Sequence, residues 1–416
     1  MKRILLLILA VWWAGGVQGQ TKQANAARKS KADAAWVKNI PVEEVIKWRR
    51  HIHQNPEISF KEEQTSKYVE DVLKSMGNIE VSRPAKTSVI GVLKGAKPGK
   101  TVAFRADMDA LPMQEETDLP FKSKNDGVMH SCGHDAHTAM LLGTAATLSR
   151  MQKELPGTVY FIFQHAEETP PGGAIDVINS GALKGVEAFF GMHVLPDFPA
   201  GHVGILPVGA ASTAQDIFNL NIIGKGSHGS MPHLGIDPIV VGAAIVSALQ
   251  TVVSRNVEPG EMTVVTIGKF QSGDAFNVIA DRAELAASIR TTSDKTRKQV
   301  EERIKEIIES ITKAYGATYE LDYINTYPAI QNDEALNAHA RKSAVAALGK
   351  EQIFDAPMMT ASEDFAYYRK IAPVSFMTLG IGKGPANHNP GFTVEESALQ
   401  NGVKAQVQII LDYLNK

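Results

Sequence analysis

The apolar positions of this chain fall into short runs that alternate between helical and strand spacing. Ile40 to Gln54 and Phe60 to Met76 carry apolar residues at helical spacing, and Gly77 follows the second segment. Val89 to Leu93 and Thr101 to Arg105 are apolar runs separated by a turn of glycine, proline and lysine, which is typical of buried strands. The pattern therefore predicts two helices followed by two strands.

Three apolar strands run directly into polar groups. Thr101 to Arg105 continues into ADMDALP, so that Asp107 and Asp109 follow the strand. Thr158 to Gln164 continues into HAEE, and Ala188 to His193 reads AFFGMH. Open α/β sheets carry their sites at the carboxyl ends of strands. The alternation of strands and helices predicts a mixed α/β sheet with helices on both faces and a site along one edge.

A different order of elements begins near Ser212. It reads as strand, helix, strand, strand, helix and strand, and the segments are Gln215 to Ile223, Pro238 to Arg255, Met262 to Phe270, Glu284 to Arg290, Ser293 to Tyr315 and Thr318 to Ile324. This βαββαβ order is the ferredoxin-like signature. We therefore expect an inserted α+β lid or dimerisation domain over 212–326, between two parts of a catalytic domain over 37–211 and 327–416.

The chain opens with a targeting segment. Two basic residues precede the short apolar run Ile4 to Trp13, and small residues follow, which is typical of a signal peptide cleaved before Gln20. We expect a signal peptide over 1–19, a polar linker over 20–36, and a mature protein that is exported, either periplasmic or secreted. No later stretch reads as long and apolar enough to span a bilayer, so we expect no stable membrane insertion after cleavage; an uncleaved anchor is the alternative.

Composition narrows the class of protein. Among 416 residues the hydrophobic content is 44%, the charged content 21% and the net charge −2, an ordinary globular balance without the basic stripe of a nucleic-acid-binding protein. The single cysteine cannot form an internal disulfide, so its thiol is intermolecular, free or ligated. In an oxidising compartment, ligation by a metal would protect it.

Candidate metal chemistry is concentrated between His130 and Leu142, HSCGHDAHTAMLL, where the cysteine, three histidines and an aspartate precede an apolar helix. Cys132 and His134 are two residues apart, and His137 follows on the first helical turn. A thiolate together with imidazoles suits zinc, cobalt, nickel or iron better than calcium or magnesium. The structural alternative is a capped helix start, with Asp135 at the positive end of the helix and incidental histidines.

The groups that could bind metal along the whole chain are Cys132, His134, Glu167, Glu168, His193 and His388. Hydrolysis of an amide needs an ion that activates water, a carboxylate that moves the proton, and a donor for the oxyanion. In an extended chain Glu167 and Glu168 point in opposite directions, so one can ligate while the other faces the substrate; a solvated surface turn is the alternative. These residues predict an α/β protein with a metal cluster, and hydrolysis is its expected chemistry.

The ordered motifs of the chain resemble one known family. They are ADMDALP, MHSCGHDAHTAML, FQHAEE, GMHV, GKGSHGSMPH, NVIAD, SEDFAYY and NHNPG, and they extend over about Val37 to Leu414. This set resembles the aminoacylase/carboxypeptidase family of two-metal amidohydrolases, in the branch of hippurate hydrolases, N-acetyl-diaminopimelate deacetylases and auxin-conjugate hydrolases. The resemblance implies a mixed-sheet metallo-hydrolase domain with a lid.

The resemblance also implies roles for residues. Those that match the family's metal ligands are Cys132, His134, Glu168, His193 and His388. They would hold two divalent ions, manganese, zinc, cobalt or nickel, with a water between the ions as nucleophile. Glu167 matches the general base. His228 matches a lid histidine that reaches a neighbouring active site and stabilises the oxyanion.

Further positions match more weakly. Asn277 matches a lid residue associated with the substrate carboxylate, and Arg290 is a second candidate for that contact or a structural lid arginine. The residues expected to orient the ligands are Asp107, Asp109 and His137. For Glu363 and Asp364 we expect helix capping. The usual glycine after the glutamate pair is Thr169, followed by two prolines, and His165 stands where proline is common.

The expected activity is cleavage of an N-acyl amino acid or short acylated peptide by a metal-dependent amidohydrolase. Three alternatives stay open: a dipeptidase or carboxypeptidase on the same fold, covalent catalysis by Cys132 assisted by His134 or His137, and a metal-dependent binding protein without activity. A homodimer through the lid is plausible, because a βαββαβ unit leaves an exposed edge strand.

Overall fold

The computed structural model describes residues 35–416. The predicted signal peptide, and the predicted linker up to residue 34, lie outside the described residues. Ala35–Asn39 forms a short 3-10 helix, η1. The residues from Ile40 to Lys416 form a separate unit, which holds every element discussed below.

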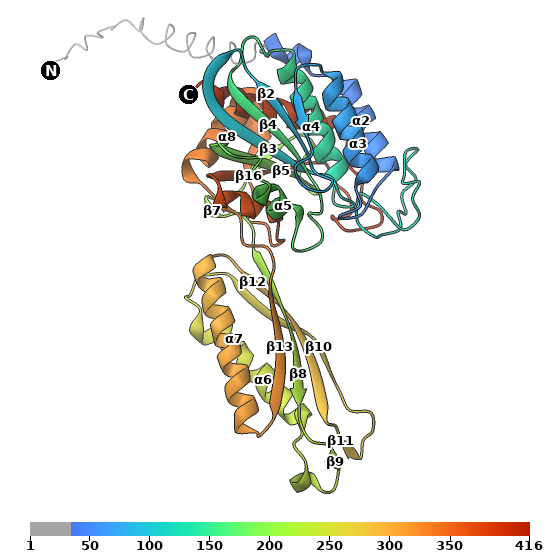
Figure 1. The fold of residues 1–416 in the computed structure, drawn as a ribbon, viewed down its shortest axis with the longest axis vertical. Helices are drawn as coiled ribbons and strands as arrows, with labels where there is room; N and C mark the ends of the chain where they lie inside the picture. The colour runs from blue at the N-terminus through green and yellow to red at the C-terminus, as the bar shows by residue number, and fades with distance from the viewer. Residues whose placement is uncertain (1–34) are drawn as a thin grey trace, which may run out of the picture. The chain divides into compact units, whose positions relative to one another are not determined.

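A mixed eight-stranded sheet organises the larger part of this unit (Figure 1). Its strands in spatial order are β1 (Glu80–Ser82), β2 (Val89–Lys94), β4 (Pro156–Gln164), β3 (Lys97–Asp107), β5 (Ala188–Leu195), β16 (Val374–Gly380), β6 (Val203–Ile205) and β15 (Ile353–Asp355). The central strands β4, β3, β5 and β16 run parallel. Strand β2 pairs antiparallel with both β1 and β4, and β6 pairs antiparallel with β16 but parallel with β15. The carboxyl ends of β3, β4 and β5 therefore meet at one edge of the sheet, as predicted.

Helices cover both faces of this sheet, because successive side chains of its strands point to opposite faces. Phe190 of β5 contacts His339 and Tyr413, and Phe189 stacks on Tyr368 with ring centroids 5.0 Å apart. The helices on the first face are α2 (Val42–Gln54), α3 (Glu63–Ser75), α4 (His134–Ser149), α8 (Glu334–Leu348) and α9 (Ser397–Leu414). Those on the second face are α5 (Gly173–Asn179) and η5 (Asp364–Lys370). Every residue of α4 is buried, since that helix is apolar or small-sided all round after its first turn, and the polar side chains of the first turn have partners inside the protein.

A four-stranded antiparallel sheet forms the smaller part. Its strands in spatial order are β10 (Thr263–Ser272), β12 (Arg282–Thr291), β8 (Ala214–Ile223) and β13 (Thr318–Asn325). Helices α6 (Pro238–Thr251) and α7 (Asp294–Ala314) pack on one face, as Figure 1 shows. In α7 the buried positions Val300, Ile304 and Ile308 recur every four residues. The predicted βαββαβ order, and with it the predicted fold class, is confirmed.

Short elements complete the described residues. They are β7 (Gly209–Ala210), β9 (Ser227–His228), η2 (Pro232–Leu234), η3 (Val252–Asn256), β11 (Val278–Ile279), β14 (Gln331–Asn332) and η4 (Lys350–Gln352). Two of the pairs that they form are β9 with β11 and β7 with β14.

Two expectations from the sequence need correction. The helix predicted from Phe60 begins at Glu63, because Phe60 has a positive φ of 67° and the Glu57 carboxylate accepts from the backbone N–H groups of Gln64 and Thr65. The segment Pro238–Asn256, mean hydropathy 1.5, is long and apolar enough to cross a membrane by length and composition, which the sequence analysis overlooked. In the structure, Val241 of this segment is fully buried in the cluster between α6, α7 and the sheet.

A buried arginine connects the central strands to the start of η5. Arg105 on β3 is 3% exposed, and its guanidinium donates to Asp107 Oδ2 at 2.7 Å and to Asp364 Oδ1 at 2.6 Å. Its Nη2 also lies 3.0 Å from Glu363 Oε1, and its Nε donates to Gln164 Oε1 of β4 at 3.0 Å. Removing the cation would leave several buried carboxylates without a counter-charge.

Arg105→Met is therefore expected to lower the free energy of unfolding by about 3–5 kcal/mol. Arg50→Met is the matched control, since Arg50 also pairs with a carboxylate, that of Glu396, but its side chain is 48% exposed; we expect a loss of about 0–1 kcal/mol. Urea denaturation of both variants measures the difference. Equal losses would contradict the structural role assigned to the Arg105 cluster.

Candidate metal centre and active site

The donors predicted as metal ligands converge at the carboxyl edge of β3, β4 and β5. Cys132 precedes α4, and its Sγ lies 3.3 Å from Nε2 of His193 on β5. His388 Nε2 lies 3.2 Å from Glu168 Oε1, and His134 Nε2 lies 3.9 Å from the same oxygen. The ligand atoms form overlapping groups that each lie within 4.8 Å, a spacing that suits a shared metal centre.

Hydrogen bonds fix which imidazole nitrogen faces the site. Nδ1 of His134 donates to the carbonyl oxygen of Asp109 at 2.8 Å, and Nδ1 of His193 donates to the carbonyl oxygen of Val194 at 2.8 Å. Both rings therefore present an Nε2 lone pair to the cluster, as metal-binding histidines do. His134 Nε2 and Glu168 Oε1 are buried and have no hydrogen-bond partner among the described residues, which is the state expected of atoms that bind a cation.

Asp109 connects two of the predicted ligands. Its Oδ1 lies 3.2 Å from His134 Nδ1, and its Oδ2 accepts from the Glu168 backbone N–H at 2.9 Å and from Ser59 Oγ at 2.7 Å. Burial works to raise the pKa of Asp109, but the hydrogen bond and the charge of His134, together with the hydrogen bonds from Glu168 and Ser59, lower it. One carboxylate thus holds both a ring and a backbone in place.

Asp107 and His137 lie beside the ligands with their bonding capacity occupied. The His137 ring accepts from the Val194 backbone N–H at Nε2, 2.8 Å away, and donates from Nδ1 to Asp107 Oδ1 at 2.6 Å. The second Asp107 oxygen accepts from Arg105. This arrangement suits the orienting role that the resemblance implies for both residues.

The loop that carries His388 is pinned to the cysteine loop. The His388 backbone N–H donates to the carbonyl oxygen of Ser131 at 2.9 Å, and the Asn387 side chain donates to that of Cys132 at 3.0 Å. His388 itself has a positive φ of 63°, a conformation that non-glycine residues rarely adopt. Two segments more than 250 residues apart in the chain are therefore held as one ligand-bearing surface.

Asp135 does not cap α4, contrary to the structural alternative for this motif. Its carboxylate instead accepts from Arg49 Nε at 2.9 Å and lies 2.9 Å from His53 Nδ1, both on α2. Burial lowers the pKa of His53, but Asp135 outweighs burial and raises it to about 9. The metal loop is thus anchored from behind by an ionic contact between two helices.

The sequence analysis treated Glu167 and Glu168 as an extended pair, but the structure shows that they do not continue β4. The strand ends at Gln164, Ala166 has a positive φ of 50°, and the two glutamates follow in a bend. Glu167 is 7% exposed, and burial followed by the charge of Glu363 raises the pKa of its carboxyl well above the usual range. A solvated surface turn is therefore excluded for this pair.

A cavity of about 600 Å³ opens beside these groups. Its lining includes Cys132, Glu167, Glu168, His193 and His388, together with apolar side chains such as Phe198, Ile217, Met358 and Met359. Arg290 of β12 also lines it, and one of its terminal nitrogens, Nη1, is buried without a hydrogen-bond partner among the described residues. Burial lowers the pKa of this guanidinium, so an anionic ligand would be favoured beside it.

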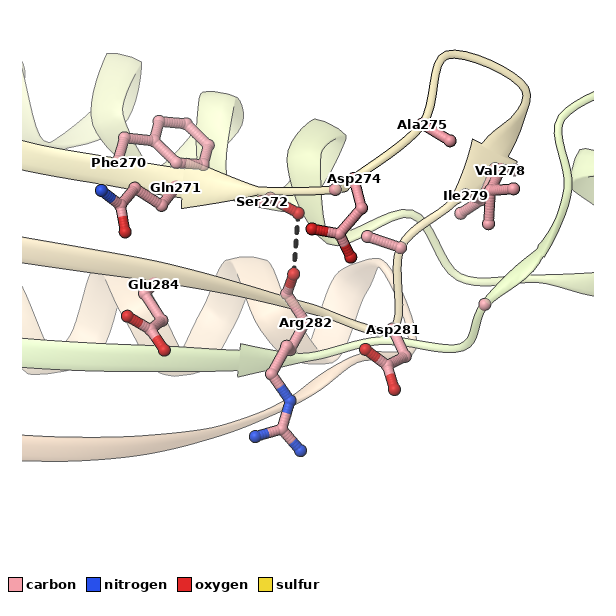
Figure 2. A pocket seen from close by; sticks show the side chains of 13 residues that line it. Phe270, Gln271, Ser272, Asp274, Ala275, Val278, Ile279, Asp281, Arg282 and Glu284 are labelled. Carbon is pink, nitrogen blue, oxygen red and sulfur yellow. Dashed lines mark hydrogen bonds between the residues drawn. The ribbon is translucent and has the colours of Figure 1, made fainter.

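His228 and Asn277 do not line this cavity. His228 is exposed on β9, where it pairs with Val278 of β11, and the carbonyl oxygen of Asn277 accepts from Gly229. Figure 2 shows the nearby end of the β10–β12 hairpin, where Phe270, Asp274 and Val278 line an open hollow of about 860 Å³. The structure brings the predicted ligands, Glu167 and Arg290 together and leaves these two lid residues apart from them.

Sequence reasoning missed several residues of the site. Tyr327 lines the cavity and donates from its hydroxyl to the carbonyl oxygen of Glu167 at 2.6 Å. Glu363 caps η5, as expected, but it also lines the cavity, and burial raises its pKa to about 8. Arg105, which binds Glu363 and Asp364, was also missed. A signal for it was present, because it is a lone cation in the apolar strand TVAFRAD, whereas no comparable signal marked Tyr327.

Comparisons with known proteins agree with this geometry. The sequence profile of Peptidase family M20/M25/M40 matches residues 103–412. The N-acyl-L-amino acid amidohydrolase of Geobacillus stearothermophilus is 46% identical over 297 residues, which cover 71% of this chain and 80% of that protein. The N-acetylcysteine deacetylase of Bacillus subtilis is 42% identical over 356 residues, 85% of this chain and 93% of that protein. The solved structure of the Bacillus subtilis YXEP protein, described as a dinuclear metal binding peptidase, matches with a TM-score of 0.80 at 38% identity, over 90% of this chain and 98% of that one.

Asp109→Ala is expected to weaken metal affinity by about 10–100-fold, because the Glu168 backbone N–H loses its acceptor and the His134 ring keeps only the Asp109 backbone carbonyl as its orienting partner. Asp126→Ala, at an exposed loop position, serves as the control and should leave metal affinity unchanged. Calorimetric titration of the chelator-treated protein with zinc or cobalt measures the affinity. Wild-type affinity in Asp109→Ala would show that Asp109 does not orient the ligands.

Proposed function

Because the chain belongs to peptidase family M20/M25/M40, we propose that it is a metal-dependent amidohydrolase that cleaves the amide bond of N-acyl amino acids. One observation carries this proposal. Thiol, imidazole and carboxylate donors that could bind metal line the same cavity as the buried Glu167 carboxyl, and apolar side chains line the rest of it. The relatives described as N-acyl amino acid hydrolases support the same reading.

The donor set fits two divalent ions. The residues that would hold them are Cys132, His134, Glu168, His193 and His388. Burial and the nearby carboxylates of Glu168 and Glu167 raise the pKa of the Cys132 thiol well above its ordinary value, so a cation is needed to stabilise the thiolate. Thiolate and imidazole ligands favour zinc, cobalt or nickel, and manganese remains part of the proposal through the resemblance. When bound, such ions would polarise the substrate carbonyl and lower the pKa of a water.

Glu167 is the group that moves the proton. A buried carboxyl with a raised pKa can take a proton from the attacking water and hold it until the leaving nitrogen accepts it. The Tyr327 hydroxyl donates to the backbone carbonyl of Glu167, and the next backbone N–H, that of Glu168, donates to Asp109, so the backbone that carries this carboxyl is held in place. Positioning of this kind allows one carboxyl to act first as base and then as acid.

The cavity suggests how the substrate is held. Phe198, Ile217, Met358 and Met359 offer an apolar surface for the acyl group or the amino-acid side chain. Arg290, whose buried Nη1 has no hydrogen-bond partner within residues 35–416, offers a charged hydrogen bond for the free carboxylate. We therefore propose substrates that combine an apolar acyl group with a free α-carboxylate.

The test is release of free amino acid from a panel of N-acetyl, N-benzoyl and long-acyl amino acids beside unblocked dipeptides. Protein from Gln20 onward would be assayed with and without chelator and with added zinc, cobalt or manganese. We expect chelator-sensitive cleavage of the N-acyl set, with apolar acyl groups favoured. Glu167→Gln is the control and should retain metal while losing activity by about 10²–10⁴-fold.

Other outcomes of the panel decide between the alternatives. Cleavage confined to unblocked dipeptides would place the chain with peptidases, in line with the description of its YXEP relative. Chelator-resistant activity that alkylation abolishes would support Cys132 as a nucleophile. No turnover with any metal would support a binding protein.

Arg290→Gln tests the carboxylate contact. Loss of a charged hydrogen bond of about 1.5–3 kcal/mol corresponds to a fall of about 10–100-fold in kcat/KM. Arg282→Gln on the same strand is the matched control, because Arg282 is exposed and lines the distant hairpin hollow instead of the cavity. With a substrate whose carboxylate is esterified, wild type and Arg290→Gln should have similar kcat/KM values. Equal kinetics of the two variants on the free acid would remove Arg290 from substrate binding.

His228 enters the proposal through a second copy of the chain. In one chain it lies apart from the cavity, so the oxyanion role implied by the resemblance requires the lid of a partner. Exposed apolar residues on the lid, including Ile239, Val240 and Phe276, are consistent with a covered surface in a homodimer. A monomer with full activity at assay concentrations would contradict this part of the proposal.

A further inference from the structure

The bend that presents Glu167 and Glu168 begins at a residue in a strained conformation. Ala166 has a φ of 50°, a left-handed conformation that costs a non-glycine residue roughly 1–2 kcal/mol. It is fully buried, so water cannot satisfy its backbone. Its N–H donates to Glu62 Oε1 at 2.8 Å, and its carbonyl oxygen accepts from Gly173 at 3.1 Å. These two bonds hold the conformation that directs the next two residues.

Glu62 is a buried carboxylate that no step described above uses. It is 0% exposed, and both of its oxygens are occupied. Oε1 accepts from the backbone N–H groups of Ala166 and of Phe60, the latter at 3.0 Å, and Oε2 accepts from Thr87 Oγ1 at 2.7 Å. Burial, followed by the charge of Asp109, raises its pKa to about 7. Holding a carboxylate here is unfavourable unless its contacts compensate.

Capping of α3 does not explain Glu62, although Glu62 immediately precedes that helix. The side chain of Glu57 performs the capping, with Oε1 accepting from Gln64 N–H at 3.1 Å and Oε2 from Thr65 N–H at 2.8 Å. The Glu62 side chain instead reaches Ala166, 104 residues away in the chain. Its contacts therefore serve the bend after β4.

We propose that Glu62 is a positioning residue for the reaction: its carboxylate holds Ala166 in the left-handed conformation and so aims Glu167 at the substrate. This inference rests on the proposed role of Glu167. The neighbouring residues have anchors of their own, Ser88 for the His165 backbone N–H, Tyr327 for the Glu167 carbonyl and Asp109 for the Glu168 N–H. Without Glu62 the buried Ala166 N–H has no acceptor, and the peptide can rotate toward the ordinary conformation.

The contacts predict an order among substitutions. Glu62→Met keeps the volume and removes the acceptor, and kcat should fall by about 10²-fold, the scale expected for a misplacement of about 1 Å. Metal content and KM should change little. Glu62→Gln keeps Oε1 as acceptor, and its amide can donate to the Thr87 hydroxyl, so it should retain most of kcat. Glu62→Asp keeps the charge but is one methylene shorter, so it should lose kcat despite folding normally.

Glu57→Met is the matched control, because it disturbs the same helix terminus without touching Ala166. It should lower Tm while leaving kcat close to wild type. A loss of kcat in Glu62→Met that only parallels its loss of Tm, as in Glu57→Met, would overturn the proposal. So would wild-type kcat in Glu62→Asp, which decides the question even if Glu62→Met does not fold.

Crystal structures separate this inference from the proposed function. The wild-type panel decides the reaction. Independently, Ala166 should keep its positive φ in Glu62→Gln and leave it in Glu62→Asp, with the Glu167 carboxyl displaced. An unchanged bend in Glu62→Asp would overturn the positioning role whatever the substrate proves to be.

Discussion

The site depends on how the protein offsets the electrostatic cost of burying several carboxylates close together. Asp107, Glu167, Glu363 and Asp364 lie close to one another, and Arg105 is the permanent cation that pairs with three of them. Burial raises the pKa of Glu167, Glu363 and Asp364, so these carboxyls release their protons less readily than isolated carboxyls do. Burying an unpaired charge is costly, and this cost is reduced by the Arg105 cation and by the raised pKa of three of the carboxyls. Proton transfer and metal binding thus draw on the same electrostatic imbalance.

The sequence predicted most elements, and it predicted which candidate ligands would lie together, because both leave local signals. Apolar runs ending in ADMD, HAEE and GMH marked the carboxyl edge of the sheet, and parallel strands bring such ends together whatever lies between them. The metal motif at Cys132 and His134 is a local spacing. The βαββαβ order of the lid likewise follows from periodicity alone.

What the sequence could not predict is set by contacts between distant segments. Alternation along a strand suggested opposite directions for Glu167 and Glu168, but β4 stops earlier and Ala166 turns the chain, since tertiary hydrogen bonds outweigh its local preference. Asp135 reads as a helix cap until Arg49 and His53 on α2 are seen beside it. The separation of His228 from the cavity also depends on tertiary placement. Each of these features depends on a contact between residues far apart in the chain, and a single sequence does not show which distant residues meet.

The large sheet is built from strands that come before and after the inserted ferredoxin-like unit in the chain, and this order matters for biosynthesis. Strand β16 lies between β5 and β6, and α9 packs on α4, yet both come from the last part of the chain. His388 lies between them in sequence. A nascent chain therefore carries Cys132, His134, Glu168 and His193 long before it holds the strand that completes their sheet or the last histidine of the set. Because domains fold from the amino terminus as they are synthesised, the ferredoxin-like unit can form first, whereas the catalytic centre can be completed only after β16 and His388 have been made. A chain that stops before β16 would therefore carry four of the five candidate ligands on a sheet that lacks one of its inner strands.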